Sequence, residues 1–163
     1  MEAGMQKLEV AKKIPDFRLK VLRGEKMSLR ELQGKIVLLN FFAYCCEICR
    51  KESAAFDKLG GEMKGKGVVF LKVATEGKEK DLLTFMDEYN ISSPIVVDKN
   101  GSVARAYQAF GHHETFFIGP EGKIFGKSFG IGIWTSPNMK SVLEHLVARP
   151  NRQISGKIRS YPF

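Results

Sequence analysis

The chain has 163 residues, 44% of them hydrophobic and 27% charged, with a formal net charge of +8 at pH 7. This composition is typical of a soluble globular protein, and the length suits one domain with a self-sufficient core. No apolar run approaches the roughly 18 residues that span a bilayer, and the three cysteines are too few to staple a disulfide scaffold.

The positive charge does not by itself indicate a nucleic-acid partner. Lys and Arg are interleaved with Asp and Glu along the chain, apart from a basic segment at 149–159. Because no groove-reading motif accompanies them, we expect a solvated basic surface and no bound nucleic acid.

The first part of the chain alternates strand and helix patterns. Residues 14–21 alternate apolar and polar side chains, which indicates an edge strand, and 28–32 read as one capped helical turn. Residues 36–42 form an unbroken apolar run, which predicts a strand buried on both faces. Apolar residues at helical spacing predict a helix over 47–64, and 67–74 are a second buried strand.

The second part continues this alternation and ends in a hairpin. Residues 80–89 carry a helical pattern, 94–98 are a short extended piece and 103–110 a short helix. The turn Gly119-Pro120-Glu121-Gly122 lies between apolar runs and predicts a hairpin over 115–129, and 138–148 form a closing helix.

Strands that alternate with helices predict an α/β fold with a parallel portion and a final antiparallel hairpin. We expect one domain over 1–163, with a core at about 10–148. Beyond residue 148 the composition becomes polar, so we expect 149–163 to be a flexible tail.

All three cysteines, Cys45, Cys46 and Cys49, lie at the junction between the strand at 36–42 and the following helix. The unpaired amide hydrogens and the dipole at a helix start favour an anion, and a thiol there can have its pKa lowered to about 7 or below. Cys49, one turn after Cys46, could close a ring with it. The spacing therefore indicates a redox pair, or else a metal site.

Four segments resemble one known family. Residues 34–43 followed by 46–52, together with 14–17 and 115–124, are similar to the thioredoxin superfamily and, within it, to TlpA/ResA-like extracytoplasmic thiol–disulfide oxidoreductases. The resemblance implies a thioredoxin-like fold, with a central mixed β-sheet flanked by helices and an N-terminal β extension. It also implies a thiol–disulfide oxidoreductase that acts on protein thiols and disulfides.

The resemblance further implies roles for three residues. Cys46 would be the exposed nucleophile and Cys49 the buried resolving thiol, and Glu52, three residues later on the same helix, would exchange a proton with Cys49. A surface ion pair is the competing interpretation of Glu52. Glu47, near the helix start, complements the dipole. We expect a monomer without a cofactor.

The expected location is extracytoplasmic, either periplasmic or outward-facing on a membrane anchor. The first residues lack the apolar core of a secretory signal, so a cytosolic protein is the competing interpretation.

The sequence departs from the family pattern at three places. Cys45 stands where the family usually has tryptophan, and no proline lies between Cys46 and Cys49. His113 aligns with the cis-proline that faces the cysteines, with His112 beside it. Because a non-proline cis peptide costs about 3–4 kcal/mol, we expect a trans or rebuilt loop there.

These departures support a second hypothesis, in which the protein is a copper or zinc chaperone or sensor. Thiolates and imidazole suit Cu(I) and Zn(II), and the candidate ligands are Cys45, Cys46, Cys49, His112 and His113. The simpler alternatives are that Cys45 is a small buried apolar residue and that His113 holds loop hydrogen bonds.

Two further functions were weighed. A peroxidase of the peroxiredoxin type would need a hydroxyl three residues before its cysteine, where this chain has Ala43. A thioredoxin-like domain kept for interaction only remains a third interpretation, in which the oxidised and reduced forms behave alike.

Overall fold

A computed structural model describes the backbone of residues 5–13 and all atoms of residues 16–109, 113–130 and 132–148. Its centre is a six-stranded sheet in the order β1-β8-β7-β4-β5-β6. β4, β5 and β6 run parallel, whereas β7, β8 and β1 run antiparallel to their neighbours, so the predicted mixed α/β architecture is confirmed. The strands are β1 (Met5–Lys13), β4 (Ile36–Phe42), β5 (Val68–Ala74), β6 (Ile95–Val97), β7 (Glu114–Ile118) and β8 (Lys123–Phe129).

A second, two-stranded sheet lies near the N-terminus. It pairs β2 (Arg18–Lys20) with β3 (Lys26–Ser28), and an isolated bridge from Val21 to Val96 attaches it to β6. The predicted strand at 14–21 thus contains β2, while residues 14–15 lie outside the described residues. The predicted helical turn is the 3-10 helix η1 (Leu29–Leu32), which the Glu31 carboxylate caps by accepting the Ser28 N–H at 2.9 Å.

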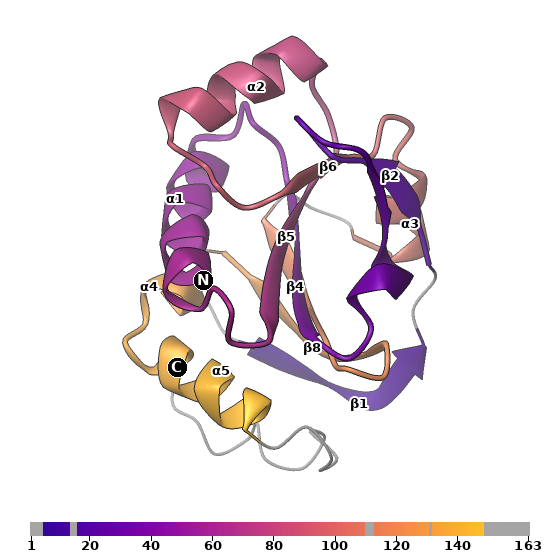
Figure 1. Ribbon diagram of the computed structural model, residues 1–163, viewed down its shortest axis with the longest axis vertical. Coiled ribbons are helices and arrows are strands. Elements are labelled where there is room, and N and C mark those ends of the chain that lie inside the picture. The colour runs from indigo at the N-terminus through magenta and orange to yellow at the C-terminus, as the bar shows by residue number, and fades with distance from the viewer. Residues whose placement is uncertain (1–4, 14–15, 110–112, 131, 149–163) are drawn as a thin grey trace.

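Helices cover both faces of the main sheet (Figure 1). α1, α4 and α5 lie on one side, α3 and the β2–β3 sheet lie on the other, and α2 lies across one end. Their bounds are α1 (Glu47–Glu62), α2 (Glu79–Glu88), α3 (Ser102–Ala106), α4 (Gly132–Thr135) and α5 (Asn138–Val147). The predicted helices agree with α1, α2, α3 and α5 to within a few residues, whereas β1, β3 and α4 were not predicted.

The core that positions the site is built around β4 and α1. All seven residues of β4 are buried, as the unbroken apolar run predicted. The inward side of α1 carries Phe56 and Leu59 at helical spacing, and the Phe56 ring packs edge-on against Phe70 and Trp134, each with centroids 4.9 Å away. A Cβ at Gly60 would lie 3.1 Å from the Phe70 ring, so glycine allows α1 to approach β5 this closely.

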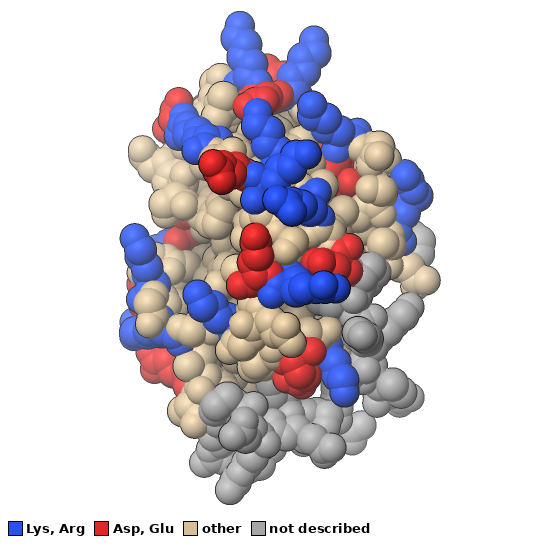
Figure 2. Space-filling model, turned by 45° about the vertical axis from the view of Figure 1, so that its right-hand side comes forward, with Lys and Arg blue, Asp and Glu red and all other residues tan. Residues whose placement is uncertain are grey.

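The surface agrees with the charge pattern of the sequence. Figure 2 shows Lys and Arg side chains spread over the visible face with acidic side chains between them. Among the helices of the described ranges, none has both the length and the apolar character needed to cross a bilayer. The expected tail at 149–163 lies outside the described residues.

Candidate active site

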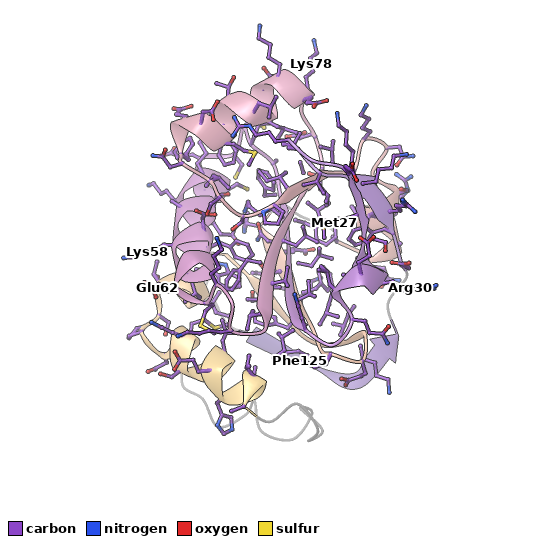
Figure 3. All side chains as sticks on the ribbon, viewed as in Figure 1. Met27, Arg30, Lys58, Glu62, Lys78 and Phe125 are labelled. Carbon is purple, nitrogen blue, oxygen red and sulfur yellow. The ribbon has the colours of Figure 1, made fainter. Side chains whose placement is uncertain are left out.

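The candidate site occupies the turn from β4 into α1. Thr75, directly after β5, holds this turn by donating its N–H and its hydroxyl to the Phe42 carbonyl, each at 3.2 Å. The Cys46 N–H closes the turn by donating to the Ala43 carbonyl at 3.2 Å. The turn lies at the α2 end of the molecule: Figure 3 shows Lys78, directly before α2, at that end, and Glu62, the last residue of α1, toward the opposite end.

Cys46 is the N-cap of α1. Its backbone is extended (φ −81°, ψ 122°), and its sulfur accepts the Cys49 N–H at 3.3 Å. The residue is half-buried, and its sulfur faces the helix start through the Cys49 N–H. A thiolate at this place is stabilised by an amide hydrogen and by the positive end of the helix dipole. The position of Cys46 at the helix start is confirmed, and its role as the nucleophile stays a prediction.

Cys49 is fully buried one turn further along α1. Burial and, second, a hydrogen bond with the Cys46 side chain raise the pKa of the Cys49 thiol to about 12. The two side chains are thus in contact, as the sequence predicted, and all three cysteines of the chain are free. At neutral pH Cys49 is a protonated thiol that needs a base before it can attack a disulfide.

Glu52 is the buried acid nearest to these thiols in the chain. Its side chain is fully buried, so the surface ion-pair interpretation is wrong. Oε1 accepts N–H groups of Asn40 at 2.9 Å and Trp134 at 3.2 Å, and no atom of the described residues bonds to Oε2. Burial raises the pKa of Glu52 to about 7, against the lowering effects of Lys72 and of the two N–H donors.

Lys72 is a fully buried cation close to Glu52. Its Nζ donates to Asn40 Oδ1 at 2.7 Å and lies over the rings of Phe42 and Phe56, at 4.4 and 4.9 Å from their centroids. Burial lowers the pKa of Lys72 to about 8, while the nearby Glu52 charge acts to raise it. The Lys72 ammonium group therefore loses its proton more readily than a surface lysine does.

Asn40 connects these charged groups. It lies directly beside Lys72 of β5 in the parallel register and beside Thr115 of β7 in the antiparallel register. Its carbonyl accepts from Lys72, and its amide donates to Glu52 and, at 2.9 Å, to Thr115 Oγ1. We call these five residues, Asn40, Glu52, Lys72, Thr115 and Trp134, the polar cluster.

Sequence reasoning missed four members of the polar cluster. A signal was nevertheless present, because Asn40 and Lys72 each interrupt an otherwise apolar strand near its middle. A polar residue inside a fully buried strand needs a partner, so two of them in neighbouring strands predict each other. The pattern gave no comparable signal for Trp134, which comes from α4.

Cys45 does not belong to the buried part of the site. Its side chain is exposed, so the interpretation of Cys45 as a buried apolar residue is wrong. Its thiol donates to Glu76 Oε1 at 2.8 Å, and this bond is the main cause that raises the pKa of Cys45. The preceding residue, Tyr44, is held by Arg50, whose Nε donates to the Tyr44 carbonyl at 3.0 Å.

The histidine candidates give the metal hypothesis no support. His113 is half-buried with a left-handed backbone (φ 58°), and its Nδ1 is buried without a partner among the described atoms. In the described part of the chain, no three His, Cys, Asp or Glu side chains gather closely enough to hold a metal ion. His112, and with it the trans or rebuilt loop expected before His113, lies outside the described residues.

Two hollows in the surface lie away from the cysteines. One of about 240 Å³ opens at the opposite end of β4, between η1 and the β7–β8 turn. The other, of about 480 Å³, runs along the C-terminal end of α1 beside β5 and the residues before β6. Neither of these two hollows is lined by a cysteine.

Comparison with known proteins places the chain in a family. The family model described as AhpC/TSA matches residues 10–126. The chain belongs to the AhpC/TSA family. It is 37% identical to the thioredoxin-like protein YneN of Bacillus subtilis over 145 residues, which cover 88% of this chain and 82% of that protein.

Further relatives of this AhpC/TSA family member are named thiol-disulfide oxidoreductases, the activity that the sequence predicted. Thiol-disulfide oxidoreductase ResA of Oceanobacillus iheyensis is 39% identical over 114 residues, which cover 68% of this chain and 59% of that protein. The solved thioredoxin domain of a thiol-disulfide oxidoreductase from Bacteroides vulgatus has a TM-score of 0.73 at 26% identity, covering 84% and 96% of the two chains. The predicted resemblance to ResA-like members of the thioredoxin superfamily is confirmed.

Proposed function

We propose that this protein is a thiol–disulfide oxidoreductase that exchanges protein disulfides through Cys46 and Cys49. The observation that carries this proposal is the contact at the start of α1, where the half-exposed Cys46 sulfur accepts the N–H of the buried Cys49. Relatives named thiol-disulfide oxidoreductase ResA support the proposal. The exchange uses the chain's own side chains and requires no cofactor.

In the first step the Cys46 thiolate attacks a substrate disulfide. A bond forms between the Cys46 sulfur and one substrate sulfur, the substrate S–S bond breaks, and the other substrate sulfur leaves as a thiolate. Cys46 lies at the helix start, and its residue is only half-buried, so a substrate can approach it. The product of this step is a mixed disulfide at Cys46.

In the second step Cys49 resolves the mixed disulfide. Its proton passes to the Glu52 carboxylate, its sulfur bonds to the Cys46 sulfur, and the remaining substrate sulfur leaves as a thiolate. Asn40 and Trp134 hold Glu52 Oε1, so the free oxygen Oε2 is the one that takes the proton. With a pKa near neutrality, Glu52 releases this proton to solvent when the step is complete.

We further propose a class of substrate and a cellular location for this protein. The substrates are proteins with accessible disulfides, which the half-buried position of Cys46 beside exposed residues of the same turn allows. We place the protein outside the cytosol, as the ResA-like resemblance of residues 34–52 implies. Both statements follow from the proposed activity and the family.

The test measures reduction of insulin and of glutathione disulfide by the reduced full chain. Cys46→Ser should lower the rate by about 10³-fold while the circular dichroism spectrum stays unchanged, because the attacking sulfur is gone. Cys45→Ser is the matched control and should keep most of the activity. If Cys46→Ser reduces these substrates as fast as the parent, the proposed function of this site is wrong.

A further inference from the structure

The site contains a third thiol that the exchange does not use. Cys45 is adjacent to Cys46 in the chain and more exposed than Cys46, and it lies in the same turn. Attack on a disulfide depends on the share of thiolate and on access. On access alone, Cys45 would compete with Cys46 for every substrate.

Attack by Cys45 would form a product that the site is not built to resolve. The Cys45 sulfur would bond to a substrate sulfur and release the other as a thiolate, which leaves a mixed disulfide on Cys45. The resolving thiol of Cys49 is buried and forms a hydrogen bond with the Cys46 side chain. The Cys45 thiol instead points to Glu76 in the loop after β5. Such an adduct would persist and block the turn.

The backbone around the Cys45–Glu76 contact is held on both sides. Thr75 bonds to the Phe42 carbonyl through its N–H and its hydroxyl. Gly77 has φ 110°, and a Cβ there would lie 2.7 Å from the Tyr44 ring, so the loop after β5 lies directly against the turn before Cys45. Two segments far apart in the sequence thus bring the carboxylate to the thiol.

We propose that Glu76 keeps Cys45 as a protonated hydrogen-bond donor and thereby directs disulfide exchange to Cys46. A carboxylate that accepts the S–H at 2.8 Å favours the thiol and opposes a thiolate in the same place. Glu76 is a positioning residue that touches neither substrate nor Cys46 in this role. That disulfide exchange is directed to Cys46 rests on the proposed function. That Glu76 keeps the Cys45 thiol protonated does not.

The first experiment isolates Cys45 in the full chain by Cys46→Ser and Cys49→Ser together. The rate of Cys45 alkylation by iodoacetamide at neutral pH is then compared with and without Glu76→Gln. Loss of the negative charge should raise the rate about threefold, the size expected for an exposed charge contact. Glu79→Gln, which removes an exposed carboxylate that pairs with Lys20, should leave the rate unchanged.

A salt series separates a charge effect from a change in access. High salt screens exposed charges, so it should raise the Cys45 rate in the Glu76-containing protein and leave the Glu76→Gln protein unaffected. In the chain with all three cysteines, mass spectrometry after a short pulse should find most of the label on Cys46, and Glu76→Gln should raise the ratio of Cys45 to Cys46 label about threefold. Circular dichroism checks that each variant is folded.

The outcomes separate this proposal from the proposed function. If Glu76→Gln and Glu76→Ala both leave the Cys45 rate unchanged, Glu76 does not control Cys45 and the inference is wrong, whatever the activity of the protein. If the rates respond as expected while no variant reduces a disulfide, the inference stands and the proposed function fails. A mixed disulfide with glutathione that accumulates on Cys45 in Glu76→Gln but not in the parent would support the inference alone.

Discussion

The two sides of the central sheet differ in the side chains that they bury around β4. The side under α1 carries the polar cluster, with a carboxyl and an ammonium group among apolar residues. The other side carries an aromatic cluster, in which ring centroids lie 5.5 to 6.4 Å apart at steep angles. The Lys127–Glu114 ion pair, 3.5 Å apart, lies beside its Phe116 ring. The aromatic cluster consists of Phe17, Phe41, Tyr107 and Phe116.

The difference shows which part of the molecule is built for stability. Rings that pack at steep angles stabilise the fold through buried apolar area and favourable edge contacts. A buried carboxyl and ammonium lose hydration, and apolar side chains in their place are often as stable or more so. We therefore assign stability to the aromatic cluster and, in the proposed mechanism, proton exchange with Cys49 to the polar cluster.

The largest effect on stability is expected from the aromatic cluster. Phe41→Ala removes a ring that contacts Tyr107 and Phe116, and should lower the free energy of unfolding by about 3–5 kcal/mol in urea denaturation. The exchange rate per folded molecule should stay within about threefold of the parent. Phe41→Leu, which keeps most of the volume, should cost much less. A loss of exchange rate in Phe41→Leu would contradict the division between the two clusters.

The next effect concerns Glu52 and pH. Its folded pKa is about 7 against a usual 4.5, so the folded protein binds this proton more tightly, and stability should fall by about 2–3 kcal/mol as pH rises through that range. Glu52→Gln should abolish that fall and slow the resolving step by about 10²-fold. Urea denaturation at a series of pH values and the decay of the mixed disulfide measure the two parts. An unchanged resolving step would remove Glu52 from the mechanism.

Lys72 should show the opposite sign at higher pH. Its folded pKa is about 8 against a usual 10.5, so the unfolded chain binds more protons in that interval and stability should rise, by about 2–3 kcal/mol or less. Lys72→Met should lose this rise. Relative to the parent, the variant should be most stable near pH 5, where the parent buries a charged ammonium group and Glu52 is protonated and needs no cation. Because the raised pKa of Cys49 acts in the opposite sense above pH 9, the comparison is between parent and variant: a difference in their free energies of unfolding that stays constant from pH 8 to 10.5 would contradict a buried, easily deprotonated Lys72.

The smallest effect is expected at the surface. Lys66 and Glu144 form an ion pair at 3.4 Å with both side chains about half exposed (47% each). Glu144→Gln should change the free energy of unfolding by less than about 0.5 kcal/mol, and salt should mask even that. A larger loss would mean that exposed charges contribute to this fold in the way assigned to the aromatic cluster.

Patterns that depend on neighbouring residues were readable in the sequence. The apolar run of β4 has no alternation, and such a run is compatible only with burial on both faces. Cys46 follows that strand and precedes a helical pattern, so its place at the helix start could be predicted. β1 could not, because its pairing with β8 joins residues more than a hundred positions apart.

The burial of Glu52 was the main feature that local patterns could not decide. A glutamate at helical spacing after two cysteines is compatible with a surface ion pair or with a buried acid. What decides is the tertiary packing of α4, which brings Trp134 over the carboxyl, and of β4, which presents Asn40. In the same way Cys45 meets Glu76 only through the fold, because the loop after β5 returns to the β4–α1 turn.

Trapping the mixed disulfide tests the central claim most directly. Cys49→Ser removes the resolving thiol, so a substrate protein with an accessible disulfide should remain covalently attached, and mass spectrometry should place the bond on Cys46. The adduct should be absent in Cys46→Ser combined with Cys49→Ser. Attachment at Cys45 in place of Cys46, or no adduct with any disulfide substrate, would contradict the assignment of the thiol at the start of α1 as the nucleophile.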